Sequence, residues 1–523
     1  MLHLFIMGGT DGREYIMKLR KGLRWSDGHP YTADDILFLV YDIAKFTAFE
    51  EAGGTTSSHM FRDIDVEKID DHTLRWKFGK PRSPMIMSSV FYLAGHTPAH
   101  WLKQFHPKYI GVEKVNEMVR EEGFDTMINW FIYHLDRYHR YDMGKPSMDA
   151  WVTVRFASEN HSVGVFKRNP YYFAVDPEGN QLPYMDERHV VVTSSEAVAE
   201  LRALNGDLSF YAMPLRNYVL AKKAEQAGKV KVYPWTGSAL NLAGIQFNVT
   251  HADPVIRALY KDRNFKYGVS HALNRQRLNE LLYHGLSEPW QVAPYEHDPF
   301  YHEKLAKTAV EFNPEKANVL LDESGLDKRD DNGMRLRPDG EPLAISLLAT
   351  LENMDNVAEL IVDDLKAVGL RVVHRRVDWA ARGELHQANK LDAVLWHDSY
   401  GTNGGTFMMW PQNAYLPQWW GCNWAPLWQQ WFRDNTQGEK PDPIMLEALD
   451  HFAKARSALG LAENQKHWKA ILDIAAENLW SIGTLKHPGN LAILAPYMRN
   501  VPDTRLSILR GDWGRQDVWW IEN

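Results

Sequence analysis

The chain has 523 residues, a formal net charge of −8 at pH 7 and a sequence pI near 6.3. Its length exceeds what one hydrophobic core organises, so two or three domains are expected. The acidic balance argues against general nucleic-acid binding, and 45% hydrophobic residues without a long polar tract exclude a disordered chain. The sequence contains no run of about 18 apolar residues, so it predicts no transmembrane helix.

Two features of composition bear on compartment and binding. Cys422 is the single cysteine, so no internal disulfide can form, which fits a cytosolic and a periplasmic protein equally. The first residues have a short apolar start but neither the basic region nor the cleavage site of a signal peptide. The chain holds 20 Trp, 22 Tyr and 21 Phe, which indicates surfaces for ring stacking as well as for core packing.

The first half of the chain predicts strands alternating with capped helices. A strand and an aromatic, polar turn at 19–31 precede a helix capped by Thr32, with Asp35 in its first turn. Two short strands are expected at 68–78, and a helix is expected to start at Pro98. A strand and then a helix that ends at Gly206 follow.

The second half predicts mixed helices and strands. Residues 263–285 read as one helix ending at Gly285, and Asn313 caps a helix that ends at Gly325. Residues 341–379 form a strand, helix and strand unit, which predicts a parallel pair. A long helical stretch covers 445–480. Mixed α/β lobes are the natural interpretation.

The segment from Leu19, "LRKGLRWSDGHPYTADDILF", resembles the signature of the family 5 extracellular solute-binding proteins, the receptors of oligopeptide, dipeptide, nickel and oligosaccharide ABC importers. Four further blocks agree in the family's order: "RNPYYFAVDPEGNQLPYMD", "FKYGVSHALNRQRLNELLYHG", "FNPEKANVLLDESGL" and "AENLWSIGTLKHP". The resemblance covers nearly the whole chain. It implies a two-lobed α/β periplasmic-binding-protein fold, of type II and the large cluster C type, with a hinge between the lobes.

The resemblance also implies domain limits. Lobe I would comprise 1–246 and 485–523, with an extra subdomain at about 1–155, and lobe II would comprise 247–484. The crossings near Phe247 and Thr484 would form the hinge. Family members carry a signal peptide and several strands before the signature, so a truncated or mis-started first lobe is expected here. A native cytosolic relative is the alternative.

Enzyme motifs are missing from the sequence. It contains no Walker A loop, no dinucleotide-binding glycine pattern, no HExxH and no GxSxG. His96 and His100 are four residues apart, but Pro98 lies between them, so the two rings need not share a face. His134 and the residues up to Asp142 lie beside two arginines, which favours a solvated helix face. Neither a metal nor a cofactor is predicted.

The segment 395–432 is the strongest candidate for ligand binding. It follows a predicted strand at 391–396 and is rich in Gly, Pro, Asn and Trp, and long loops at the carboxyl end of a strand are where open α/β folds bind ligands. A hydrophobic minicore under the loop is the alternative, and Trp428 and Trp431 are assigned to such packing. The candidate ligand-contacting tryptophans are Trp396, at the end of the predicted strand, and Trp410, Trp419, Trp420 and Trp424 of the loop.

Asp398 bears on the ligand class. In peptide-binding relatives an aspartate shortly after a tryptophan anchors the amino group of the ligand, and here Asp398 follows Trp396 one residue earlier than usual. That shift turns the side chain to the other face of an extended segment, and a loop-capping role is the alternative. An oligosaccharide is therefore favoured over an oligopeptide. Amide side chains for sugar hydroxyls are Asn403, Gln412, Asn413 and Asn423.

The sequence thus predicts the substrate-binding component of an ABC importer, which delivers its ligand to the membrane subunits of a permease. The resemblance implies a monomer in the periplasm or at the cell surface, which is not an enzyme and needs no cofactor. A glycan-acting hydrolase with an aromatic-lined cleft is the competing class. Such an enzyme needs two carboxylates at a defined separation, which a sequence does not display.

Overall fold

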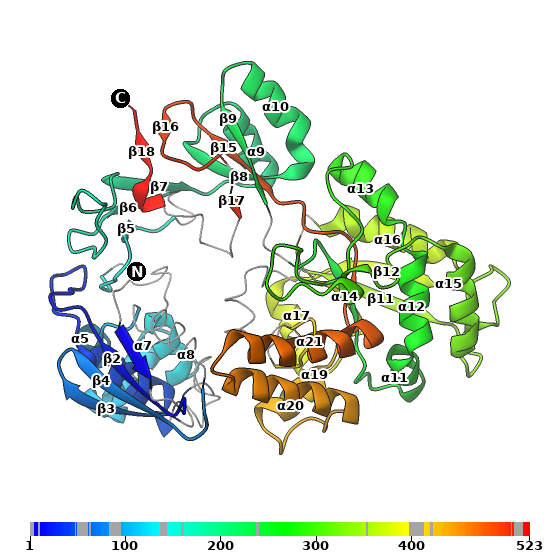
Figure 1. Cartoon of the computed structure of the whole chain (residues 1–523), viewed down its shortest axis with the longest axis horizontal. Coiled ribbons are helices and arrows are strands. Elements are labelled where there is room, and N and C mark those ends of the chain that lie inside the picture. Colours follow the sequence, from blue (N-terminus) through cyan, green and yellow to red (C-terminus); the bar gives the residue numbers. More distant parts are fainter. Residues whose placement is uncertain are drawn as a thin grey trace.

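The computed structural model describes residues 5–8, 11–47, 49, 61, 64–82, 96–135, 144–157, 162–236, 240–351, 354–396, 413–418, 422–503, 505–506 and 516–522. Figure 1 shows three groups of elements, which differ in colour because each comes mainly from one part of the sequence. No helix in these ranges is both long and apolar enough to cross a membrane.

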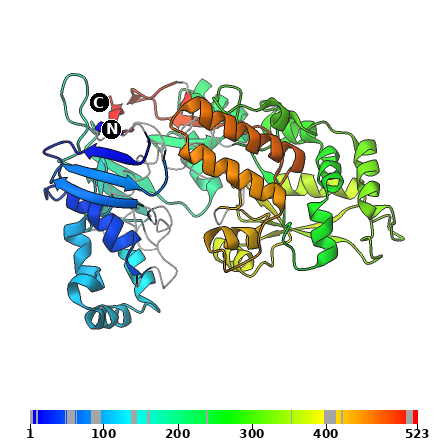
Figure 2. The same cartoon turned by 60° about the horizontal axis from the view of Figure 1, so that its bottom comes forward.

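An antiparallel sheet of order β1-β2-β4-β3 forms what we call the N-terminal subdomain. Its strands are β1 (Phe5–Gly8), β2 (Glu14–Lys18), β3 (Ile64–Asp70) and β4 (Thr73–Phe78). The strand pair predicted at 68–78 is confirmed. Below the sheet in Figure 2 lie the helices α5 (Ala99–Leu102), α6 (Pro107–Ile110), α7 (Val112–Glu121) and α8 (Met127–Leu135).

The helix predicted at Thr32 is confirmed. The Thr32 backbone N–H donates to Asp35 Oδ2 at 2.9 Å, and the Thr32 hydroxyl accepts from Asp34 N at 3.3 Å. Helix α1 (Ala33–Leu37) continues directly into the π-helix η1 (Phe38–Ala44). The strand expected after Leu19 is wrong, because β2 ends at Lys18. Two glycines at positive φ, Gly22 and Gly28, bend the following segment into turns.

Lobe I is the part of the chain built on the sheet β17-β9-β15-β8. Its strands are β8 (Phe210–Pro214), β9 (Lys231–Thr236), β15 (Asn490–Leu494) and β17 (Arg505–Leu506), with helices α9 (Glu196–Leu204) and α10 (Tyr218–Gln226). Strand β15 pairs antiparallel with both β8 and β9, so the end of the chain returns to this lobe. A smaller sheet holds β5 (Trp151–Arg155), β6 (Val163–Arg168) and β7 (Glu187–Val191), and β16 (Met498–Arg499) pairs with β18 (Trp520–Ile521).

Lobe II is the part built on the sheet β12-β11-β13-β10-β14. Its strands are β10 (Gly244–Phe247), β11 (Ala344–Ala349), β12 (Arg371–Arg376), β13 (Ala393–Trp396) and β14 (Ile482–Gly483). Strand β11 pairs parallel with β12, and α16 (Asp355–Ala367) connects them, so the predicted parallel unit is confirmed. The sheet packs into the largest hydrophobic core of the chain.

Helices surround this sheet (Figure 1). They include α11 (Pro254–Lys261), α12 (Arg263–Ala272), α13 (Arg275–Tyr283), α14 (Glu303–Lys307), α15 (Pro314–Leu321), α17 (Trp379–Gln387), α19 (Pro426–Arg433), α20 (Pro443–Ser457) and α21 (Leu461–Asn478). Asn313 caps α15 as predicted, because its side chain accepts from Lys316 N at 2.9 Å. The single helix predicted at 263–285 is wrong. The chain is extended at Leu273, and Asn274 then caps α13 by accepting from Arg277 N at 2.9 Å.

The chain crosses between the lobes twice, before β10 and after β14. Leu242 N donates to Leu485 O at 2.9 Å, so the two crossings lie side by side. The buried Asn241 side chain ties them together, because its Oδ1 accepts from Thr484 N at 3.0 Å and its Nδ2 donates to Trp290 O at 2.9 Å. Thr484 of the predicted hinge lies at the second crossing, whereas Phe247 ends β10 within the lobe II sheet, and the hinge itself stays a prediction.

Candidate ligand-binding site

Trp396 is the last residue of β13, the central strand of the lobe II sheet, and pairs with Gly244 of β10. Its ring meets the Trp379 ring edge-on, with centroids 5.6 Å apart. The guanidinium carbon of Arg382, on α17, lies 4.7 Å from the centroid of the Trp396 ring. Trp396 is 6% exposed, so in this arrangement protein side chains cover most of the predicted contact residue.

A buried chain of hydrogen bonds runs from α17 to the centre of the sheet. Arg382 Nη1 donates to Asn423 Oδ1 at 2.6 Å, and Asn423 Nδ2 donates to Gln246 Oε1 at 3.0 Å. All three side chains are buried, and burial lowers the pKa of Arg382 to about 10. Asn423, predicted as a sugar-binding amide, uses both ends of its amide to fasten the chain after residue 421 to the sheet.

Trp424 packs in the core of lobe II. It is fully buried, its ring stacks on Trp480 with centroids 5.1 Å apart, and its Nε1–H donates to Asn413 O at 2.7 Å. The Trp428 ring meets the Trp424 ring edge-on, with centroids 6.1 Å apart. Trp428 is buried, which confirms its assignment to the core. The packing alternative for the loop tryptophans therefore holds for Trp424.

The remaining predicted contact residues lie outside the described residues. They are Asp398, Asn403, Trp410, Gln412, Trp419 and Trp420. The described flanks show where the segment is held. Besides the anchor at Asn423, the Tyr415 hydroxyl donates to Val292 O at 2.8 Å, so residues 413–418 are fastened to the segment after α13. The candidate segment thus starts at the end of β13 and is anchored to lobe II at residues 413–418 and again at Asn423.

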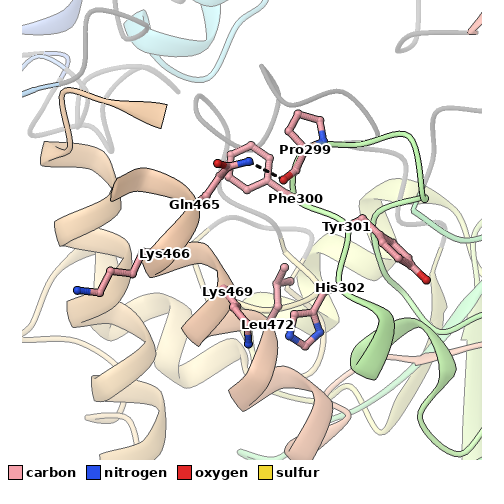
Figure 3. Close-up of a pocket in the computed structure, with 8 residues that line it drawn as sticks. All are labelled: Pro299, Phe300, Tyr301, His302, Gln465, Lys466, Lys469 and Leu472. Atoms are coloured by element: carbon pink, nitrogen blue, oxygen red, sulfur yellow. Dashed lines mark hydrogen bonds between the residues drawn. The ribbon is translucent and has the colours of Figure 1, made fainter. Parts of the chain in front are cut away.

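A pocket of about 250 Å³ lies in lobe II between α21 and residues 299–302 (Figure 3). Gln465 Nε2 donates to Pro299 O at 2.7 Å, which joins the two walls. Asp473 accepts from His302 Nε2 at 2.9 Å and from Lys469 Nζ at 2.7 Å. Sequence reasoning missed this pocket, because its walls are far apart in the chain and carry no motif. Its lining residues are Pro299, Phe300, Tyr301, His302, Gln465, Lys466, Lys469 and Leu472.

Asp298 precedes the pocket segment and is 4% exposed. Its Oδ1 accepts from Phe300 N at 2.7 Å, whereas Oδ2 has no hydrogen-bond partner among the residues that the structure describes. Burial raises the pKa of this carboxyl to about 6, and the hydrogen bond from Phe300 opposes that rise. Asp298 is therefore an acid whose charge changes near neutral pH.

The histidines weighed as metal ligands bind separate carboxylates. His100 Nε2 lies 2.7 Å from Asp27 Oδ2, and His96 Nδ1 lies 3.7 Å from Asp149 Oδ2. His134 is buried and stacks on Phe105 with centroids 3.8 Å apart, so the predicted solvated face is wrong for this residue, and residues 136–142 lie outside the described ranges. Within those ranges no group of three or more His, Cys, Asp or Glu side chains could hold a metal ion.

Comparison with known proteins gives the family. The model of the bacterial extracellular solute-binding proteins, family 5 Middle, matches residues 9–420. The chain belongs to this family. The resemblance seen in the sequence is thereby confirmed, and a family of solute-binding proteins gives no support to the hydrolase alternative.

Individual relatives carry names of both ligand classes. The periplasmic alpha-galactoside-binding protein of Rhizobium meliloti is 27% identical over 94% of this chain and 69% of its own length. The oligopeptide-binding protein AppA of Bacillus subtilis is 23% identical over 71% of this chain and 59% of its own length.

Solved structures confirm the two-lobed α/β fold. The periplasmic binding protein MelB of Agrobacterium fabrum C58, in complex with stachyose, matches with a TM-score of 0.75 over 99% of this chain and 76% of its own, at 23% identity. A structure named oligopeptide-binding protein OppA matches with a TM-score of 0.66 over 99% of this chain and 84% of its own, at 28% identity.

Proposed function

We propose that this chain is the ligand-binding component of an ABC importer, which captures an oligosaccharide between lobes I and II and delivers it to the membrane subunits of a permease. The observation that carries the proposal is the pair of adjacent crossings fastened by Asn241 and Thr484. Two lobes joined in this way can close about a ligand by rotation at the crossings. Family membership supports the same function.

The proposed ligand contacts are in the segment that follows β13. In open α/β sheets, ligands bind beyond the carboxyl ends of the strands, where Trp396 lies in this fold. The buried Arg382, Asn423 and Gln246 side chains hold the far end of that segment. The proposed contacts are Trp396, Asp398, Asn403, Trp410, Trp419 and Trp420.

An oligosaccharide is proposed because of side-chain chemistry, since the names of the relatives point both ways. A peptide receptor must hold a charged amine and a carboxylate inside a closed cleft, and burying those charges without fixed partners costs several kcal/mol. In this chain the expected aspartate is displaced by one residue. A neutral sugar needs flat rings beneath its C–H faces and amides for its hydroxyls, which Trp419, Trp420 and Asn403 supply.

The proposal extends to location and assembly. The family is extracellular by description, and the Rhizobium relative is periplasmic by name. We accordingly place this chain in the periplasm or at the cell surface, where it acts as a monomer and meets its permease.

Calorimetry with stachyose and with a mixture of peptides of three to nine residues tests the ligand class. We expect stachyose to bind the wild type, and Trp419→Ala or Trp420→Ala to weaken binding about 5- to 150-fold, since loss of one stacking ring is worth about 1–3 kcal/mol. Trp520→Ala, on an exposed ring of lobe I, is the control and should bind normally. Tight peptide binding that survives both loop substitutions and disappears in Asp398→Ala would overturn the sugar assignment.

A further inference from the structure

Two chain turns from different parts of the molecule touch each other. Gly12, between β1 and β2 of the N-terminal subdomain, lies against the Cδ2 methyl of Leu459, between α20 and α21 of lobe II. Figures 1 and 2 both show one end of α20 and α21 beside the N-terminal subdomain. A Cβ atom built on Gly12 would collide with this methyl group, so the backbone itself forms one side of the contact.

The turn at Gly12 is held in place from within its own subdomain. Arg82 N donates to Gly12 O at 2.9 Å, and the Tyr15 hydroxyl donates to Arg82 O at 2.5 Å. Asp11 Oδ1 accepts from Arg13 N at 3.0 Å. Gly12 has φ +68°, a conformation that glycine adopts without strain. The turn therefore presents a fixed, flat backbone surface.

The turn at Leu459 is equally well braced. Ala458 N donates to Lys454 O at 3.0 Å, and the buried Asn464 side chain donates from Nδ2 to Ala455 O at 2.8 Å. These bonds fix the end of α20 against the start of α21. Leu459 projects from this corner and is still 46% exposed while it touches Gly12.

The position of the contact connects it to lobe movement. The N-terminal subdomain is bonded to the segment between β6 and β7 of lobe I, because Arg20 Nη1 donates to Phe173 O at 2.9 Å. Lobe II joins lobe I at the crossings of Asn241 and Thr484. A rotation about those crossings that separates the lobes would therefore also separate Gly12 from Leu459.

We propose that Leu459 is a positioning residue for ligand capture: its contact with Gly12 stabilises the closed arrangement of the lobes and so raises ligand affinity without touching the ligand. This inference rests on the proposed function. A contact that exists in the closed state alone adds its free energy to ligand binding, because the ligand then spends less on closing the lobes. Glycine suits position 12 because its φ of +68° would strain any other residue, and a side chain there would also push against the Leu459 methyl group.

A double-mutant cycle tests the contact with stachyose as the probe. We expect Leu459→Ala to weaken binding about three- to tenfold, and Gly12→Ala to weaken it through the collision with the leucine methyl. In the double variant the loss should be smaller than the product of the single losses, because the shortened side chain removes the collision. Leu461→Ala, equally exposed on the same corner, is the matched control and should bind normally. Strictly multiplicative losses would overturn the proposal.

A ligand-free measurement separates this inference from the proposed function. Spin labels on Lys80→Cys and Glu447→Cys, both exposed and on opposite sides of the contact, report their distance by pulsed electron resonance. We expect Leu459→Asp to shift the ligand-free protein towards longer distances, whereas Leu461→Asp leaves the distribution unchanged. Identical distributions in both variants would overturn the closure contact. If Leu459→Asp gives the expected distance shift but the wild type does not bind stachyose, the result counts against the sugar assignment alone.

Discussion

Arg275 donates two hydrogen bonds to the carbonyl oxygen of Gly483, from Nε at 3.0 Å and from Nη2 at 2.7 Å. The N–H of the same glycine donates to Gln291 Oε1 at 2.7 Å, so both of its backbone groups are fixed. Gly483 is the last residue of β14, directly before the chain leaves lobe II. The buried guanidinium thus holds the starting point of the second crossing.

Removing this guanidinium should destabilise lobe II. Arg275→Met leaves the carbonyl oxygens of Gly483 and Ser270 without the donors they have now, and we expect a loss of about 2–4 kcal/mol in the free energy of unfolding. Urea denaturation followed by circular dichroism measures it. Arg263→Met removes an exposed arginine of an ion pair and should cost less than about 1 kcal/mol. Equal losses in the two variants would show that the buried network adds nothing.

Asp298 should make stability depend on pH. Burial raises the pKa of its carboxyl from 3.8 to about 6 in the folded protein, so between these pH values the folded state binds more protons than the unfolded state. Stability should therefore fall as the pH rises from about 4 to 6 and stay lower above it. Asp298→Asn removes this loss, and at pH 8 it should be more stable than the wild type by up to about 3 kcal/mol.

Denaturation curves at pH 4 and pH 8 check this prediction. The gain from Asp298→Asn should shrink to less than about 1 kcal/mol at pH 4, because the folded carboxyl is protonated there and the unfolded one is about 40% protonated. Asp331→Asn, the same substitution at an exposed position, is the control. A gain that is the same at both pH values would mean that packing, and not proton binding, distinguishes the variant.

Arg382 should control the anchoring of the candidate binding segment. Arg382→Met keeps an aliphatic chain against Trp396 but removes the donor to Asn423 Oδ1. We expect faster backbone hydrogen exchange at residues 413–425 and weaker ligand binding, since the segment loses a buried attachment. Arg376→Met, on a side chain that is 50% exposed at the end of β12, is the control. Unchanged exchange in Arg382→Met would contradict the anchoring role.

Local signals predicted much of the fold correctly. Thr32 and Asn313 were correctly predicted as helix caps, because a cap depends on residues within one turn. Gly206 was correctly predicted to end α9, because its φ of +81° suits glycine. The break at Leu273 was missed, since the helical pattern continues through it. Asn274 starts a new helix at this point by capping α13, and its backbone N–H donates to Asp364 Oδ2, 90 residues away.

The candidate site was less predictable for a physical reason. Burial of a tryptophan depends on partners far along the chain, so the sequence did not separate Trp424, which stacks on Trp480, from its neighbours in the loop. Asn423 looked like a free amide, yet its partner Gln246 lies 177 residues away. The pocket beside α21 carries no motif at all. Composition and order along the chain indicate the kind of site, whereas tertiary contacts decide which side chains face the ligand.

Closure of the lobes should be measurable in solution. We expect small-angle X-ray scattering to give a smaller radius of gyration with saturating stachyose than without ligand, because the lobes rotate about the crossings at Asn241 and Thr484. Trp419→Ala, at sub-saturating stachyose, should stay closer to the ligand-free curve. Superimposable curves with and without bound ligand would contradict closure.

Mass spectrometry of the ligand that the protein retains when purified from its native host tests the central claim most directly. Denaturation releases the bound ligand from the protein. The released small molecules are compared with those from a Trp419→Ala/Trp420→Ala variant prepared in parallel. The account predicts an intact oligosaccharide in the wild-type sample that is depleted in the variant. A ladder of peptides in the wild-type sample, or sugar recovered as cleaved products, would contradict it.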